Sequence, residues 1–419
     1  MKKILIYKYI DIFNASDYST LNQTFKNKYN GQCPNFGNKL WYQGLISEIS
    51  TEDNYLTYYN NNISIEQINS EFDMILYPMA NIFSTTFAQY LPSMTDFFNR
   101  IKIPVYIISC GAEANTYDEL NQLVSAIGDV STDFIKSIYN TNGDFALRGF
   151  FTAEFFIELG FNNLNVVGCP SLFQNGSSLF ISNSKIKRED FCAAINGRFD
   201  LAVPLLKDYN SIYYDQDILF DIMYNKEYYD QLKDGIKGNL RWLRTSGFKL
   251  FLPELILSNR IRLLADMWDW RYSLQHEEIT FSFGTRIHGN IMALLSGIPC
   301  VIVNIDTRVK EMAEFYNIPN IDYFEATKLS QTPNALYDLY LKTDYSDFNR
   351  TYPGKFNSFN EFLQKCGIVD SINTNNSFWD KSNGEYPVSA IDEAIAKSKE
   401  ITNNKLVYSL LLSLIDKLK

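Results

Sequence analysis

The sequence predicts an α/β protein made of two Rossmann-like domains around a central cleft, followed by a helical C-terminal extension. Short apolar runs alternate with longer amphipathic stretches, which is typical of parallel strands joined by crossover helices. This pattern occurs twice, and a polar segment without helical periodicity, residues 174–189, separates the two sets. We therefore expect domains at residues 1–178 and 179–330 and the extension at residues 331–419.

The first half contains five short apolar runs that predict strands, each ending in small or polar residues. They are residues 3–7, 73–77, 105–109, 145–147 and 165–167. The amphipathic stretches between them predict helices near residues 39–48, 87–99 and 152–159. Ligands of parallel α/β sheets bind at the carboxyl ends of strands, so candidate site residues are expected there.

The second half repeats this arrangement, with strands expected at residues 191–195, 211–214, 249–251, 279–283 and 300–304. Beyond residue 330 the strand signal fades, and residues 359–366 and 388–398 resemble helices. Residues 405–419 carry an apolar stripe at helical spacing that is flanked by lysines. We expect this segment to dock on the body of the protein, to form a homo-oligomer contact or to touch a membrane, in that order of preference.

Composition excludes several classes of protein. Its 419 residues are 46% apolar and 21% charged, as in a folded globular chain. The net charge of −10 excludes a broad basic surface for nucleic acid, so an anionic ligand would need a local basic pocket. Six cysteines without a CxxC pair predict reduced thiols in a cytoplasmic protein and no metal site.

The two ends of the chain give no membrane-spanning signal. No apolar run approaches the ~20 residues that cross a bilayer. Lys8 and Asp11 interrupt the N-terminal apolar run, which favours a buried first strand over a signal peptide.

Asp215 and Asp217 imitate a metal-binding D-x-D pattern, but two acids after a strand more often cap a helix. We therefore assign no metal.

Residues 279–306 carry the strongest chemical signal. They predict a strand, a tight turn at residues 284–289, a short helix at 290–296 and a second strand. The turn places Arg286 and His288 at a strand end beside a helix N-terminus, where anion binding and proton transfer are both available. The flanking glycines would let the backbone approach a ligand.

Structural roles are the alternative for this pair of residues. Arg286 would then form an ion pair, and His288 would be a packed loop histidine. The chain has only two histidines, and the other, His276, lies in a polar run. A functional role for His288 is therefore favoured.

The run GTRIHGNIMALLSGIPCVIVNIDTRVKEMAEFYNIP, residues 284–319, resembles the C-terminal signature of the polysaccharide pyruvyl transferase family. Further segments are similar to that family in the same order, so that the resemblance covers about residues 30–325. These segments are NFGNKLW (35–41), MAN (79–81), CGAEA (110–114), ALRGFFTAEFFIELG (146–160) and VVGCPSLF (166–173).

This resemblance implies a GT-B-like fold and transfer of a pyruvyl group from phosphoenolpyruvate to two hydroxyls of one sugar, which forms a cyclic ketal. The donor's phosphate and carboxylate suit two guanidinium clamps, and a histidine is suited to proton transfer. We expect catalysis by His288 and Arg286. The expected donor-binding residues, mainly of the C-terminal domain, are Arg148, Arg286, His288, Gly289, Asp306 and Arg308.

The N-terminal domain is the expected acceptor side. Asn35, Asn38, Asn81 and Glu113 lie at its strand ends or loops, where amides and carboxylates can bind sugar hydroxyls, although turn or cap roles are the alternative. The expected acceptor is a glycan or lipid-linked oligosaccharide of a cell-surface polymer. The enzyme would work in the cytoplasm without a cofactor, and peripheral contact with the inner face of the membrane is one option.

Two other functions fit the same architecture. One is a glycosyltransferase that uses a nucleotide sugar, because fold alone does not choose the donor. The other is a catalytically silent glycan-binding protein in which His288 serves packing only.

Overall fold

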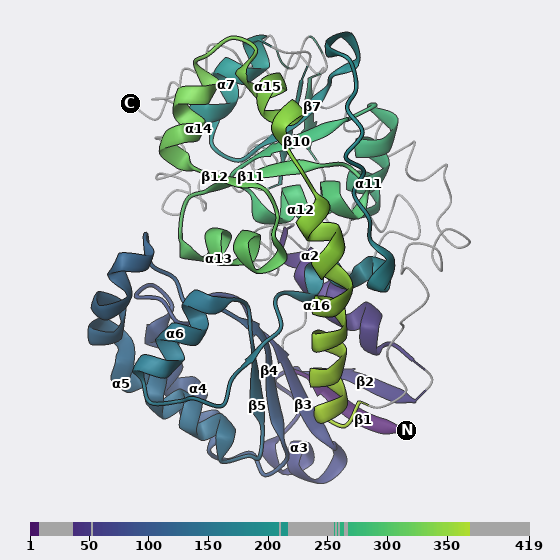
Figure 1. The fold of residues 1–419 in the computed structure, drawn as a ribbon. Helices are drawn as coiled ribbons and strands as arrows, with labels where there is room; N and C mark the ends of the chain where they lie inside the picture. The colour runs from purple at the N-terminus through teal and green to yellow at the C-terminus, as the bar shows by residue number, and fades with distance from the viewer. Residues whose placement is uncertain are drawn as a thin grey trace, which may run out of the picture.

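Two parallel six-stranded sheets, each flanked by helices, form the described chain, one above the other in Figure 1. The computed structural model describes residues 1–7, 37–51, 53–208, 211–216, 255, 258, 260–263 and 267–368. Each sheet is apolar in its middle strands and is covered by helices on both faces, which is the Rossmann-like arrangement.

The N-terminal sheet has the order β2-β1-β3-β4-β5-β6. Its strands are β1 (Lys2–Ile6), β2 (Asn54–Tyr58), β3 (Met74–Pro78), β4 (Val105–Cys110), β5 (Asp144–Leu147) and β6 (Asn165–Val166). Its helices are α2 (Gly37–Ile49), α3 (Ile65–Glu71), α4 (Leu91–Phe98), α5 (Leu120–Tyr139) and α6 (Phe150–Glu158), with 3₁₀ turns η2 (Ala88–Tyr90) and η3 (Tyr117–Glu119).

The C-terminal sheet has the order β12-β11-β10-β7-β8-β9. Its strands are β7 (Ala193–Asn196), β8 (Ile212–Asp215), β9 (Ile261–Leu263), β10 (Phe281–Gly284), β11 (Cys300–Asn304) and β12 (Asn320–Asp322). Its helices are α7 (Phe199–Asp208), α11 (Met267–His276), α12 (Ile287–Leu295), α13 (Thr307–Tyr316) and α14 (Tyr323–Ser330). Two more helices follow, α15 (Ala335–Lys342) and α16 (Ser346–Lys365).

The two parallel sheets confirm the predicted class of two Rossmann-like domains with a helical C-terminal region. All predicted strands that fall in the described residues are present, within one or two residues at their ends. The expected strand at 249–251 and the expected helices at 388–398 and 405–419 lie outside the described residues. No predicted strand corresponds to β2, β9 or β12, and no predicted helix corresponds to α3, α5, α7, α11, α13, α14 or α15.

The polar connection between the sheets is packed rather than free. It includes two 3₁₀ segments, η4 (Pro170–Ser178) and η5 (Arg188–Asp190), and buries Leu179 and Ile181. Asn349 of α16 pairs with the backbone of Ile181 through two hydrogen bonds of 2.9 and 2.8 Å. The connection therefore runs along α16 as a fixed strap.

Helix α16 returns the chain from the upper domain to the lower one (Figure 1). Near its end, Lys365 Nζ lies 2.7 Å from Asp144 Oδ2 of the N-terminal sheet, and Phe362 meets Tyr106 edge to face. The predicted helix at residues 359–366 is the last part of α16. The C-terminal helices are thus shared between the domains and do not form a separate body.

Two further features concern the whole described part of the chain. None of its helices combines the length and hydrophobicity that crossing a bilayer would take. Its five cysteines, Cys110, Cys169, Cys192, Cys300 and Cys366, form no disulfide, and Cys33 lies outside it.

Candidate functional site

The turn after β10 differs from the predicted one. Helix α12 begins at Ile287 with Arg286 as its N-cap residue, so His288 lies in the first helical turn and not in a loop before it. Arg286 has extended backbone angles, with φ −88° and ψ 102°. The predicted helix began at residue 290, because a glycine usually marks a turn. Gly289 lies instead inside the helix, where Asn196 leaves little room for a side chain.

A buried amide network holds this turn. Asn196, the last residue of β7, accepts a hydrogen bond from the Arg286 N–H at 2.9 Å. Asn290 donates to the carbonyls of Gly284 and Arg286 at 3.0 and 3.1 Å and accepts from Ser282 Oγ at 2.8 Å. Because both amides are fully or almost fully buried, the network fixes where α12 starts.

Gly284 and Gly289 of this segment make room for Asn196. A Cβ on Gly284 would lie 2.0 Å from the Asn196 carbonyl oxygen. A Cβ on Gly289 would lie 3.2 Å from the Asn196 side-chain carbon Cγ. Gly284 also has a φ of +153°, a conformation that favours glycine.

Arg148 follows β5 and points a buried guanidinium group at the domain interface. Its backbone N–H donates to the Cys110 carbonyl at 3.0 Å, and only 5% of the residue is exposed. The atoms Nε and Nη2 are buried and have no hydrogen-bond partner among the described residues. Buried charged donors without partners are costly, so this guanidinium has two nitrogens available to an anion.

His288 faces the same charges. Its Nε2 is buried and accepts or donates no hydrogen bond within the described part of the chain. Burial, with the nearby charges of Arg148 and Arg308, lowers the pKa of His288 to about 3. The imidazole is therefore neutral at pH 7 and able to take up a proton.

Arg308 is the paired member of this basic group. Its Nη2 lies 2.6 Å from Asp306 Oδ2 and 3.4 Å from Glu113 Oε1. Asp306 also caps α13 by accepting from the Val309 N–H at 3.1 Å. Asn81 donates a hydrogen bond to Glu113, so two expected donor residues and two expected acceptor residues form one connected chain.

Glu311 belongs to the site, although no sequence pattern marks it. It lies in α13, is 1% exposed, and accepts hydrogen bonds from Thr152 N at 3.0 Å and from Thr152 Oγ1 at 2.9 Å, across the domain interface. Burial raises the pKa of Glu311 to about 7, while Thr152 and Arg148 act in the opposite direction. A buried glutamate and an exposed one look alike in a helical sequence.

Comparison with known proteins now decides the family. The sequence model of the polysaccharide pyruvyl transferases matches residues 17–307, more than half of the chain. The chain belongs to this family. The predicted family is therefore confirmed, and with it a transferase of polysaccharide metabolism in general terms.

No curated protein matches this family member. Among solved structures it is similar to an S. aureus MnaA–UDP co-structure, with TM-score 0.42 and 12% identity over 90% of this chain and 99% of that one. It is also similar to a UDP-N-acetylglucosamine 2-epimerase (0.38, 10%, 90% and 99%) and to the Streptomyces nogalater glycosyltransferase SnogD (0.29, 9%, 88% and 99%). These scores are too low to carry an argument, so the fold class follows from the two sheets.

The other expected site residues of this pyruvyl transferase family member have mixed placements. Asn38 lies at the start of α2, where its Oδ1 accepts a 3.4 Å hydrogen bond from Trp41 Nε1 in the same helix. Arg286 is half-buried beside His288. Gly289 is buried, so a donor contact there would use its backbone. Asn35 lies outside the described residues.

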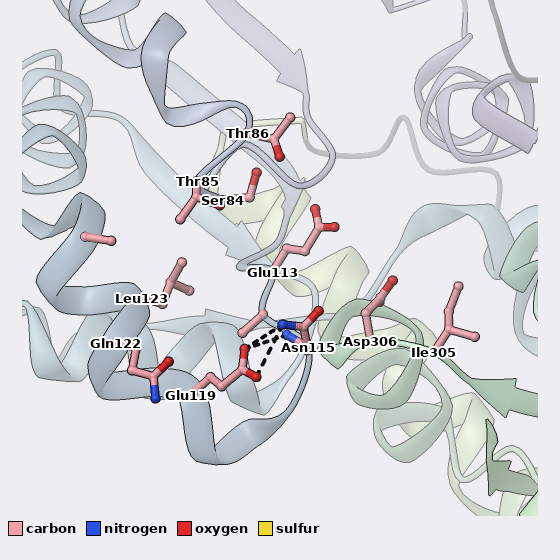
Figure 2. A pocket seen from close by; sticks show the side chains of 12 residues that line it. Ser84, Thr85, Thr86, Glu113, Asn115, Glu119, Gln122, Leu123, Ile305 and Asp306 are labelled. Atoms are coloured by element: carbon pink, nitrogen blue, oxygen red, sulfur yellow. Dashed lines mark hydrogen bonds between the residues drawn. The ribbon is translucent and has the colours of Figure 1, made fainter. Parts of the chain in front are cut away.

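A polar pocket of about 530 Å³ is lined by Glu113 and Asp306 (Figure 2), the two residues whose carboxylates contact Arg308. It lies between loops of the N-terminal domain and the residues after β11 of the C-terminal domain. Its polar lining includes Ser84, Thr86, Glu113, Glu119, Gln122 and Asp306. Sequence reasoning found Glu113 and Asp306 but missed the hydroxyl loop at residues 84–86 and the contribution of α5.

Proposed function

We propose that this protein transfers the pyruvyl group of phosphoenolpyruvate to two hydroxyls of one sugar in a glycan, forming a cyclic ketal and releasing inorganic phosphate. One observation carries the proposal: within the described residues, two buried nitrogens of Arg148 and the buried Nε2 of His288 have no hydrogen-bond partner, and the Arg148 charge contributes to the lowered pKa of His288. Phosphoenolpyruvate carries a phosphate and a carboxylate, which suit such a group.

The basic residues have separate roles in this proposal. Arg148 binds one anionic group of the donor through Nε and Nη2 in a two-pronged contact. Arg286 and Arg308, from the other domain, bind the second group, and Asp306 orients Arg308. The donor would thus be held between both domains.

His288 is proposed to take a proton from an attacking sugar hydroxyl. It is neutral in the free protein, because burial and two arginines lower its pKa, so the proton-accepting form is already present. A bound donor brings negative charge to Arg148 and Arg308, which raises the pKa of His288 and lets it hold the proton it has taken.

The overall reaction balances with these groups. Two C–O bonds form between C2 of the donor and two sugar oxygens, and the bond from C2 to the phosphate oxygen breaks. Of the two hydroxyl protons, one ends on the methylene carbon, which becomes a methyl group, and the other leaves with phosphate. No oxidant, reductant or cofactor is needed.

The setting is part of the proposal. The acceptor is a glycan or a lipid-linked oligosaccharide of a cell-surface polymer, in keeping with the family. The reaction takes place in the cytoplasm, at the inner face of the membrane, and nucleic acid is not a partner.

Thermal-shift titration tests the donor. Phosphoenolpyruvate should raise Tm, since a ligand at about a hundred times its Kd stabilises the native state by ~2.7 kcal/mol. Arg148→Gln should abolish the shift, whereas Arg350→Gln, which changes an exposed arginine on α16, should retain it. A shift with nucleotide sugars alone would overturn the proposal and indicate a glycosyltransferase. No shift with either ligand class would favour a glycan-binding protein.

A further inference from the structure

We infer that the polar pocket beside Arg308 binds an uncharged sugar unit of the acceptor and excludes sugars that carry a carboxylate or phosphate. This inference rests on the proposed function only for the reaction in which the sugar takes part. The pocket measures about 530 Å³, which is within the range of small-ligand sites. It lies where the chain places the loops after β3, β4 and β11, the carboxyl ends of parallel strands.

The charge of the lining selects against anions. Three carboxylates, those of Glu113, Glu119 and Asp306, line the pocket, and no lysine, arginine or histidine is among the described residues that do so. Arg308 balances part of this charge through Glu113 and Asp306. A phosphate or uronate in the pocket would still meet an excess of negative charge at short range.

The polar groups match sugar hydroxyls. Carboxylates only accept hydrogen bonds, so they pair with the donating side of a hydroxyl. The hydroxyls of Ser84 to Thr86 and the Gln122 amide both donate and accept, so they serve its other side. The aliphatic side chains of Leu123 and Ile305 add an apolar surface for the C–H face of a ring.

Two of the carboxylates are fixed before any ligand arrives. The Asn115 backbone N–H and side-chain Nδ2 each donate to Glu119 at 3.0 Å, as the dashed lines of Figure 2 show. Glu113 is held by Asn81 and Arg308. Groups that are held in place lose less entropy on binding, which favours a specific ligand over a general acidic surface.

Two residues of the pocket lining also contact Arg308 of the proposed donor site. Asp306 and Glu113 line the pocket and also contact Arg308, one of the two charges that lower the pKa of His288. Arg308 therefore marks the boundary between an anion-binding side and a hydroxyl-binding side. A sugar in the pocket would present its hydroxyls toward the donor.

Saturation-transfer NMR tests the pocket with methyl glycosides of glucose, galactose, mannose and their N-acetylamino forms, each neutral. Methyl glucuronide and methyl galacturonide are the charged counterparts. We expect signal transfer to at least one neutral glycoside and at least a tenfold weaker effect with the uronides. Ala126→Trp, on the exposed face of α5 that lines the pocket, should abolish the transfer. Ser125→Trp, an exposed neighbour that does not line it, should not.

Three results would overturn the inference: binding that survives Ala126→Trp, uronides that bind as well as the neutral sugars, or no neutral glycoside that binds. The phosphoenolpyruvate Tm shift is measured on the same samples and should persist in both variants. Pocket-dependent sugar binding without that shift would refute the proposed donor and leave the pocket assignment standing. A phosphoenolpyruvate Tm shift without binding of any neutral glycoside would refute the pocket assignment and leave the proposed donor standing.

Discussion

Two arginines act on His288, and they differ in what they already bind. Arg308 shares its charge with Asp306 at 2.6 Å and Glu113 at 3.4 Å. Arg148 has two buried nitrogens without a partner among the described residues. An anion therefore gains little new interaction at Arg308 and much at Arg148. The N-terminal domain is expected to bind the acceptor, but through Arg148 it also supplies the strongest proposed contact to the donor.

The largest expected effect is on the titration of the His288 imidazole. In a His276→Gln variant only His288 remains, and its NMR chemical shifts should stay constant from pH 8 to pH 5, because its pKa is lowered to about 3. Added phosphoenolpyruvate should move the titration toward neutral pH, since it offsets both arginines. A midpoint near 6.5 in the free protein would show that neither arginine acts on this ring.

The next effect isolates Arg148. Arg148→Lys keeps the charge but loses the two-pronged donor, so the Kd for phosphoenolpyruvate should rise about 100-fold by calorimetry. Arg350→Lys on the exposed face of α16 is the matched control and should leave the Kd unchanged. An effect below threefold at Arg148 would contradict the role assigned to its unpaired nitrogens.

Arg308→Lys should cost less, about tenfold in the same Kd. Its guanidinium already donates a hydrogen bond to Asp306, and a lysine at this position can keep the ion pair with Asp306. A loss equal to that of Arg148→Lys would remove the contrast between the two arginines. Comparing the two changes in Kd therefore shows which domain contributes more to binding of phosphoenolpyruvate.

The smallest effect concerns stability at the domain interface. The folded state raises the pKa of Glu311 from 4.5 to about 7, so this group's contribution to stability is present below pH 4.5 and is lost as pH rises through 7. Glu311→Gln should remove that loss and raise Tm by a few degrees at pH 8, with little change at pH 5.

Glu325→Gln is the control for this pH dependence, because Glu325 is exposed on α14. Its Tm should follow that of the natural protein at both pH values. If Glu311→Gln lowers Tm at pH 8, the charged carboxylate stabilises the interface through Thr152, and the assigned direction is wrong.

The central strands and the edge strand β6 could be predicted from sequence, whereas the other edge strands, β2, β9 and β12, could not. β2 and β12 are partly exposed, and β9 and β12 have only three residues each. These strands therefore lack the continuous apolar run that marks a strand buried on both faces. Helix α5 could have been predicted from sequence, because the apolar residues Leu123, Ile127, Phe134 and Ile138 recur at helical spacing.

Only those site residues could be predicted that stand out by residue type, by spacing or by the family resemblance. Arg286 and His288 stand out by residue type and spacing, and the family resemblance added Arg148 and Arg308. Burial decides the rest: whether Arg148 finds a partner, or Glu311 reaches Thr152, depends on packing between segments over 150 residues apart. The packing of Gly284 and Gly289 against Asn196 could not be predicted for the same reason, since Asn196 is far from them in the chain.

The contact between Asn196 and Gly284, the last residue of β10, limits which residues either position tolerates. A Cβ at 284 would collide with the backbone carbonyl of residue 196, which every residue carries, so no substitution at 196 relieves that clash. A smaller side chain at 196 would leave the Arg286 N–H without its acceptor and would remove one hydrogen bond of Asn290. Position 284 is therefore restricted to glycine by the backbone of its neighbour, whereas position 196 is restricted by the hydrogen bonds of its own side chain.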